Sequence, residues 1–302
     1  MMEVSLQRIG AGNPRLEAEL LFAHALQCTR ISLLMNPDRE FSPNEERRLE
    51  TMLDRRLLGE PLAYVLGTAD FMGHILRVGP GVLIPRSETE RFVEVVEEEL
   101  KAGRGAAGTL PSAQVTVLDV GTGSGAIPIA LALRNGNLQA VATDISSEAL
   151  AYARENVKAH GLEERIHLLE SDLFDGLGES LSRSNHIQFP RSLPGGFFDA
   201  IISNPPYIPA PDMADLPREI RDHEPPLALH GGEDGTDYLM RLIVEAPRYL
   251  KFGGLLALEF SSEQAETLSA AAFDSGVYKK SIIVRDLADR DRFLLAWKSP
   301  VS

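Results

Sequence analysis

Residues 115–134 read VTVLDVGTGSGAIPIALALR, and the fold class follows from this segment. Its first six residues form an apolar, β-branched run typical of a buried strand, and its last nine suit a helix. Between them lies the turn Gly121-Thr122-Gly123-Ser124-Gly125, in which glycines let the backbone bend tightly and approach a ligand. A strand that runs through such a turn into a helix predicts an open, parallel α/β sheet.

The sequence after this unit alternates strand-like and helix-like segments. We expect strands at 139–145, 166–171, 198–204 and 255–260, and helices at about 124–134, 147–160 and 235–250. The last stretch, KKSIIVRDLADRDRFLLAWK, instead predicts two strands joined by a polar turn at 288–291. Parallel units that end in an antiparallel hairpin favour the Rossmann-like sheet of class I methyltransferases over a dehydrogenase sheet.

Residues 1–70 indicate a small helical domain. One helix is expected to begin after Asn13, and another after Ser42, because both residues are good N-caps and each is followed by proline. Gly59 is expected to end the second helix. Cys28 most simply belongs to the core or rim of this bundle.

Residues 71–86 form the predicted connection to the sheet domain, which spans 87–302. Apolar residues alternate there with glycines, and Gly79-Pro80-Gly81 is a turn signal, so we expect a β-hairpin. The sheet domain should open with a helix that has Ser87 as its N-cap and Glu90 completing a capping box. Residues 176–196 are rich in Ser, Gly and Pro and predict an extended loop.

The composition narrows the class of protein. The chain has 302 residues, 44% hydrophobic and 25% charged, which suits about two packed domains. A net charge of −14 argues against a large nucleic-acid-binding surface. A single cysteine excludes a disulfide framework and a multi-cysteine zinc site, and we expect no metal. No apolar run approaches the ~20 residues of a membrane span, and the N-terminal residues lack targeting character, so we expect a cytoplasmic location.

Carboxylates follow the first three strands of the predicted sheet. Asp119 ends the first strand and Asp144 the second, which is where such folds bind ribose hydroxyls. The pattern G-x-G-x-G after Asp departs from the dinucleotide fingerprint, and the two carboxylates would repel a pyrophosphate. They suit S-adenosylmethionine, which is cationic and carries no phosphate. Asp172 follows the third strand and would either reach the adenine amino group or cap a helix.

The fourth strand ends in Asn204-Pro205-Pro206-Tyr207, beside the expected cofactor. The prolines fix the directions of their carbonyls, Asn204 offers a side-chain oxygen acceptor, and Tyr207 offers a flat face. This set suits a planar NH₂ group that donates to the Asn204 side-chain oxygen and the Pro205 carbonyl. Such bonds strengthen as the nitrogen gains positive charge during methyl transfer. We therefore predict catalytic roles for the four residues, with Asn204 also near the cofactor.

The two motifs resemble those of class I S-adenosylmethionine-dependent N-methyltransferases. More narrowly, the chain resembles the bacterial protein-(glutamine-N5) methyltransferases of peptide chain release factors. The resemblance covers nearly the whole length and includes the blocks RRLLGEPLAYVLG (55–67), FMGHILRVGPGVLIPRSETE (71–90) and RDHEPPLALHGGEDGTDYL (221–239). It implies a glutamine of the Gly-Gly-Gln loop of class 1 peptide chain release factors as substrate, gripped through the helical domain, and we expect the enzyme to be a monomer.

Three features depart from the family pattern. Ser87 stands where the family usually has proline, and the 176–196 segment is longer than the family pattern leads us to expect. Leu173 stands where some relatives carry an aromatic residue, which implies an apolar contact with the adenine in place of stacking.

Three alternative functions remain open from the sequence. A sibling family methylates a glutamine in a ribosomal protein. An adenine-N6 methyltransferase of DNA or RNA would also hold an NH₂ group on a planar ring, although the net charge weighs against it. A non-catalytic module would bind cofactor or release factor without chemistry, although the intact Asn204–Tyr207 motif weighs against that.

Overall fold

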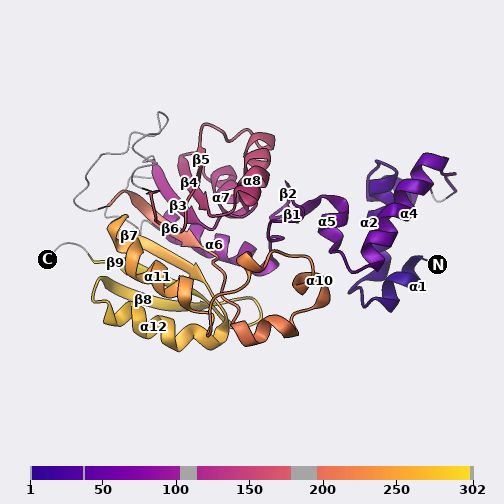
Figure 1. Ribbon diagram of the computed structural model, residues 1–302. Helices are drawn as coiled ribbons and strands as arrows, with labels where there is room; N and C mark the ends of the chain where they lie inside the picture. Colours follow the sequence, from indigo (N-terminus) through magenta and orange to yellow (C-terminus); the bar gives the residue numbers. More distant parts are fainter. Residues whose placement is uncertain (1, 37, 103–113, 178–195, 300–302) are drawn as a thin grey trace.

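The computed structural model describes residues 2–36, 38–102, 114–177 and 196–299. A group of helices from the N-terminal part stands beside a larger domain built on a sheet, with a short hairpin between them (Figure 1). Most of the predicted 176–196 loop lies outside the described residues. Within them, no helix is long and apolar enough to cross a membrane.

The N-terminal helices begin where the capping residues predict. The Asn13 side chain accepts a hydrogen bond from the Leu16 backbone, and Ser42 and Glu45 form a reciprocal capping box. Gly59 follows the second of these helices in the left-handed region, at φ +100°. The helices of this part are α1 (Met2–Arg8), α2 (Pro14–Ala25), α3 (Arg30–Met35), α4 (Pro43–Leu57) and α5 (Leu62–Leu66). They pack around a small core of their own that includes Leu6, Leu21, Met52 and Val65.

The hairpin lies nearer the N-terminus than the predicted 71–86. Its antiparallel strands are β1 (Thr68–Phe71) and β2 (His74–Arg77), and residues 78–86 are irregular. The chain turns at Met72 and Gly73, both with positive φ, as a two-residue hairpin turn requires. The Gly79–Gly81 cluster is therefore not the hairpin turn.

Helix α6 (Ser87–Lys101) corrects a second expectation. Arg86 is its N-cap, and among the residues described here no side chain caps the first turn. Ser87 is already helical, and its hydroxyl donates to Glu88. Glu90 is engaged elsewhere, because its carboxylate accepts a 2.6 Å hydrogen bond from the backbone of Met72 in the hairpin turn. The predicted capping box was wrong, because Glu90 bonds to the hairpin turn and not to the start of its own helix.

The sheet has the predicted class I methyltransferase arrangement. Its strands are β3 (Val115–Val120), β4 (Leu138–Asp144), β5 (Ile166–Glu170), β6 (Phe198–Ser203), β7 (Leu250–Glu259), β8 (Tyr278–Arg285) and β9 (Asp291–Lys298). Their order in the sheet is β5-β4-β3-β6-β7-β9-β8. All pairs are parallel except those of β9, which runs antiparallel to both β7 and β8, so the predicted terminal hairpin is confirmed. Strand β8 forms one edge and exposes Lys279 and Lys280.

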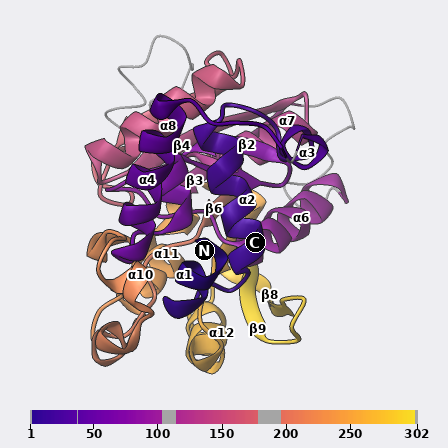
Figure 2. The same cartoon turned by 90° about the vertical axis from the view of Figure 1, so that its right-hand side faces the viewer.

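Helices cover both faces of this sheet, as its continuously apolar strands require. The main ones besides α6 are α7 (Ala126–Arg134), α8 (Ser147–Ala159), α11 (Asp237–Glu245) and α12 (Ala265–Asp274). Shorter elements are η1 (Ala210–Asp215), α10 (Arg218–Arg221), η2 (Pro226–Ala228), η3 (Ala246–Arg248) and η4 (Ser262–Gln264). Figure 2 shows the molecule from the side of the N-terminal helices, with the sheet domain behind them.

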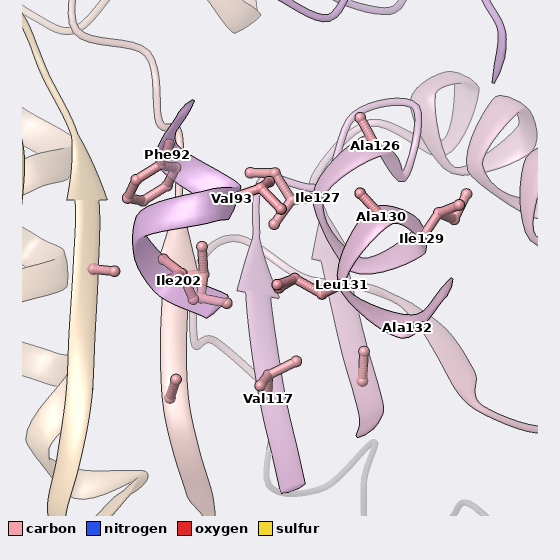
Figure 3. Close-up of a cluster of buried hydrophobic side chains, with 14 of the residues drawn as sticks. Phe92, Val93, Val117, Ala126, Ile127, Ile129, Ala130, Leu131, Ala132 and Ile202 are labelled. Atoms are coloured by element: carbon pink, nitrogen blue, oxygen red, sulfur yellow. The ribbon is translucent and has the colours of Figure 1, made fainter. Parts of the chain in front are cut away.

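The largest core lies between the sheet and α6 and α7 (Figure 3). Phe92 of α6 and Leu131 of α7 are almost fully buried there against strands β3 and β6. Each such side chain contributes roughly 2–3 kcal/mol by leaving water. A second core joins the opposite face to α11 and α12. The two cores hold the carboxyl ends of the parallel strands in fixed relation to one another.

Candidate active site

A cavity of about 210 Å³ lies at the carboxyl ends of β3, β4 and β6, where open α/β sheets bind ligands. Most of the predicted site residues line it together, namely Gly121, Thr122, Gly123, Ser124, Asp144, Asp172, Leu173, Asn204 and Pro206. Asp119, Gly125, Pro205 and Tyr207 are not part of its lining. The turn after β3 and the motif after β6 are therefore two walls of one cavity.

The glycine turn follows its predicted geometry. Gly121, Gly123 and Gly125 all have φ values in the left-handed region, between +56° and +83°. The Gly121 N–H donates to the carbonyl of Thr143 on the next strand at 2.8 Å. A Cβ on Gly125 would meet Ile129 at 3.3 Å and Ala153 at 3.5 Å, so this third glycine serves close helix packing.

Asp144 is fixed by backbone donors. One carboxylate oxygen accepts from the Gly123 N–H at 2.8 Å and the other from the Ser146 N–H at 2.9 Å. Burial raises the pKa of Asp144, and these backbone hydrogen bonds oppose the rise. Because a carboxylate has about four acceptor positions, both oxygens can still receive hydroxyl groups. The side chain thus offers an oriented acceptor pair to a diol in the cavity.

Asp119 is fully buried at the end of β3. Within the described part of the chain, neither of its carboxylate oxygens nor the Thr122 hydroxyl makes a hydrogen bond of normal geometry. Burial raises the pKa of Asp119 to about 7; the nearby Thr122 hydroxyl opposes the rise, and the charge of Asp144 adds to it. Thr122 lines the cavity, and buried polar groups without partners at such a place suit a ligand that brings hydrogen-bond donors or positive charge. The site therefore fits S-adenosylmethionine, whose ammonium and sulfonium groups are both cationic.

Asp172 and Leu173 also line the cavity. The Asp172 carboxylate pairs with the Arg241 guanidinium at 3.3 Å, so it takes part in an ion pair. Leu173 is 9% exposed and adopts φ +49°, a strained region for a side chain of this size. The pair presents one polar and one apolar surface to a ligand.

A chain of hydrogen bonds holds the side chain of Asn204. Its Nδ2 donates to the Thr89 hydroxyl at 3.1 Å, and this hydroxyl donates to the Glu259 carboxylate at 2.9 Å. Thr89 is 4% exposed and Glu259 is 1% exposed. Burial raises the pKa of Glu259 to about 7, while the Thr89 hydrogen bond and the charge of Arg292 favour its ionised form. The chain joins the first turn of α6 to the ends of β6 and β7.

The rest of the motif is held through its backbone. The Tyr207 carbonyl accepts from Gln264 Nε2 at 2.9 Å, and the same amide donates to the Gly235 carbonyl at 3.0 Å. A Cβ on Gly235 would lie 2.3 Å from the Tyr207 carbonyl oxygen, so only glycine permits this approach. Burial raises the pKa of Tyr207 to about 12, so the phenol stays protonated. Within the motif, Pro205 is buried.

Sequence reasoning did not assign a third wall of the cavity. It comes from the irregular segment after the hairpin and the start of α6, and from the chain before and within α11, with Gly81, Val82, Leu83, Pro85, Arg86, Thr89, Pro225, Leu227, Ala228, Tyr238 and Arg241 among its residues. Glu224 ties the two segments together, because it pairs with Arg86 at 2.6 Å and accepts from the Ile84 N–H. The available signal was that most of these residues fall in the blocks 71–90 and 221–239.

Comparison with known proteins identifies both parts of the chain. A model described as the PrmC N-terminal domain matches residues 2–67, and one described as a methyltransferase domain matches residues 111–288. The chain is 39% identical to the release factor glutamine methyltransferase of Moorella thermoacetica, over 97% of this chain and 96% of that protein. It is also 39% identical to the protein of the same name from Rhodopirellula baltica, over 96% and 91% of the two chains.

Solved structures agree with the fold. The human methyltransferase 10 domain containing protein has a TM-score of 0.52 at 18% identity, over 86% of this chain and 100% of that one. The delta-N METTL16 MTase domain gives 0.51 at 17% identity, over 86% and 97%. At such identities the likeness concerns the fold alone. The full-length relatives carry the assignment, and by them this chain belongs to the release factor glutamine methyltransferase family of S-adenosylmethionine-dependent enzymes.

Proposed function

We propose that this enzyme transfers a methyl group from S-adenosylmethionine to the side-chain amide nitrogen (N5) of the glutamine in the Gly-Gly-Gln motif of class 1 peptide chain release factors. The main support is that Asn204 and Pro206 line the same cavity as the glycine turn and Asp144. A methyl donor and an amide can therefore meet there. The relatives named release factor glutamine methyltransferase support the choice of substrate.

The cofactor half of the cavity has residues for each part of the donor. S-adenosylmethionine supplies an electrophilic methyl group on a positively charged sulfur. Asp144 would accept hydrogen bonds from the ribose hydroxyls, while Asp119 and Thr122 would serve the ammonium of the methionine end. Asp172 would accept from the adenine amino group, and Leu173 would cover the ring. The backbone of the glycine turn would approach the ligand closely; this turn consists of Gly121, Thr122, Gly123, Ser124 and Gly125.

The other half of the cavity would bind the methyl-accepting amide, which is a weak nucleophile. An amide nitrogen is a poor nucleophile because its lone pair is delocalised into the carbonyl. The Asn204 side-chain oxygen and the Pro205 carbonyl would accept its two hydrogens, and both bonds strengthen as positive charge develops on the nitrogen. Tyr207 would pack against the planar amide. The new N–C bond forms as the C–S bond breaks, and the nitrogen then loses one proton to water, so no dedicated base is needed.

The remaining parts of the proposal concern the surroundings of the reaction. The helical domain, residues 1–70, would grip the release factor, with the hairpin region 71–86 as the connection to the catalytic domain 87–302. The enzyme would act in the cytoplasm as a monomer, without direct contact to nucleic acid or membrane. The net charge of −14 favours a protein substrate over DNA or RNA.

A transfer assay tests the proposal. The enzyme is incubated with methyl-labelled S-adenosylmethionine and, separately, with a class 1 release factor, ribosomal proteins and duplex DNA. We expect label on the release factor, and no label on the same factor with its Gly-Gly-Gln glutamine replaced by alanine. Label on ribosomal protein or DNA, with none on the release factor, would refute the proposal that the release factor is the substrate. Cofactor binding without any transfer would make the chain a binding module.

A further inference from the structure

We propose that Thr89 and Glu259 are positioning residues whose hydrogen-bonded chain turns the Asn204 carboxamide so that its oxygen, and not its nitrogen, faces the methyl-accepting group. This inference rests on the proposed function, because it takes the acceptor to be an NH₂ group. Neither residue was selected by sequence reasoning, and neither belongs to the glycine turn or the Asn204–Tyr207 motif.

The polarity of the chain follows from the chemistry of its members. A carboxylate only accepts hydrogen bonds, so the single hydroxyl hydrogen of Thr89 goes to Glu259, at 2.9 Å. The Thr89 oxygen is then an acceptor for its other neighbour. Of the two ends of the Asn204 carboxamide only the nitrogen can donate, and it lies 3.1 Å from this oxygen. The amide oxygen is thus left for the cavity that Asn204 lines.

The orientation matters because the two ends of a carboxamide have opposite hydrogen-bonding character. An oxygen facing the cavity accepts from the incoming NH₂ and is attracted more strongly as that nitrogen becomes positive. A carboxamide rotated by half a turn would place its own NH₂ against the incoming NH₂. Two donors would then face each other, and the charge in the transition state would be repelled.

Burial favours one orientation of the Asn204 carboxamide over the other. Thr89 and Glu259 are 4% and 1% exposed, so bulk water cannot readily replace either partner when the amide rotates. The charged groups that act on Glu259 are Arg292 and Arg86, which favour the carboxylate, and Glu88, which opposes it. This direction of the hydrogen bonds requires the carboxylate form of Glu259. A protonated Glu259 would donate its own hydrogen to the Thr89 oxygen. The Thr89 hydroxyl hydrogen would then be free to donate to the Asn204 side-chain oxygen.

Three variants, measured at pH 8 and so above the pKa of about 7 of Glu259, test the role in catalysis. Thr89→Val keeps the shape of the side chain and removes the hydroxyl, whereas Thr89→Ser keeps the hydroxyl. Thr116→Val makes the same change on a partly buried residue near the start of β3, at the end of the strand away from the cavity. Transfer to the release factor gives kcat, and calorimetry gives the Kd for S-adenosylmethionine.

We expect Thr89→Val to lower kcat roughly 10- to 100-fold, the effect of losing a hydrogen bond that orients a reacting group, with the cofactor Kd within about twofold. Thr89→Ser should recover most of the activity, and Thr116→Val should match the wild type. A Thr89→Val enzyme with normal kcat would overturn the inference. So would a Thr89→Ser enzyme as impaired as Thr89→Val, or a parallel loss of cofactor affinity.

A second measurement does not depend on any substrate. In protein labelled with ¹⁵N-asparagine, the side-chain NH₂ signal of Asn204 is identified by its absence in Asn204→Ala, and its hydrogen exchange is followed. We expect slow exchange in the wild type and Thr89→Ser, and fast exchange in Thr89→Val. Equal exchange in all three would overturn the chain itself. If the wild type does not methylate the release factor, the proposed function fails, and this exchange still decides whether Thr89 holds the amide.

Discussion

Asp119→Asn tests quantitatively whether a buried carboxyl with a raised pKa destabilises the protein when no cation is bound. Asp119 is fully buried and makes no normal hydrogen bond to any residue that the structure describes, and burial raises its pKa from 3.8 to about 7. In the unfolded chain the same carboxyl ionises near pH 4. Between these two values the folded state holds a proton that the unfolded state has released. The stability of the cofactor-free protein therefore falls as pH rises through this window, and it levels off above pH 7.

The substitution removes this titration while keeping the size of the side chain. One pKa unit corresponds to 1.36 kcal/mol. Between pH 5 and pH 7, the free energy of unfolding of Asp119→Asn should therefore rise by about 2 kcal/mol relative to the wild type. The buried amide of the variant costs about 1–3 kcal/mol if it finds no partner, but this offset is the same at every pH.

Urea unfolding of both proteins without cofactor at pH 5, 6, 7 and 8 measures the difference. A control is Asp199→Asn, since Asp199 is also buried but is paired with Lys251 at 2.7 Å. That variant should be less stable than the wild type at pH 8. A difference between Asp119→Asn and the wild type that stays constant with pH would refute the reasoning.

The same carboxyl should link cofactor binding to protons. A cationic ligand favours the charged form of Asp119, so binding at pH 6 should release a proton from the wild type and not from Asp119→Asn. Calorimetry in two buffers with different ionisation enthalpies measures this release. The variant should also bind S-adenosylmethionine at least about tenfold more weakly. Equal proton release in both proteins would mean that the cationic groups of the cofactor do not lie next to Asp119.

Three further substitutions separate the parts of the molecule. Asn204→Ala should lower methyl transfer by at least about 100-fold and leave the cofactor Kd nearly unchanged in calorimetry; a lost affinity would mean that Asn204 serves the cofactor. Gln264→Leu leaves the Tyr207 and Gly235 carbonyls without their donor, so kcat should fall about tenfold at an unchanged cofactor Kd, and full activity would contradict a positioning role. Ser42→Ala breaks the capping box with Glu45 and should destabilise the helical part by about 1 kcal/mol in urea unfolding without altering the cofactor Kd.

The sequence was most informative where a local rule determines the structure. The strand at 115–120 and the N-caps Asn13 and Ser42 were predicted correctly, because strand periodicity and capping depend on neighbours in the chain. Ser87 was wrong as an N-cap because Glu90 bonds to the hairpin turn instead. No local pattern encodes that long-range contact.

The candidate site divides in the same way. The glycine turn and the Asn204 motif follow strands directly, so their meeting in one cavity was predictable from the parallel sheet. The Thr89–Glu259 pair was not, because these residues are 170 positions apart and meet only through the packing of α6 against the end of β7. A threonine in the first turn of a helix carries no sign of its partner across the sheet.

The edge strand β8 has a consequence for solubility. A strand at the edge of a sheet offers unpaired backbone groups to any other exposed strand and so invites aggregation. Lys279 and Lys280 stand exposed on this edge, and the Lys280 ammonium lies 4.7 Å from the centre of the Trp297 ring. Two positive charges on an otherwise acidic protein would repel a second copy of the same edge. Replacing both lysines with threonine would remove this protection and favour edge-to-edge association.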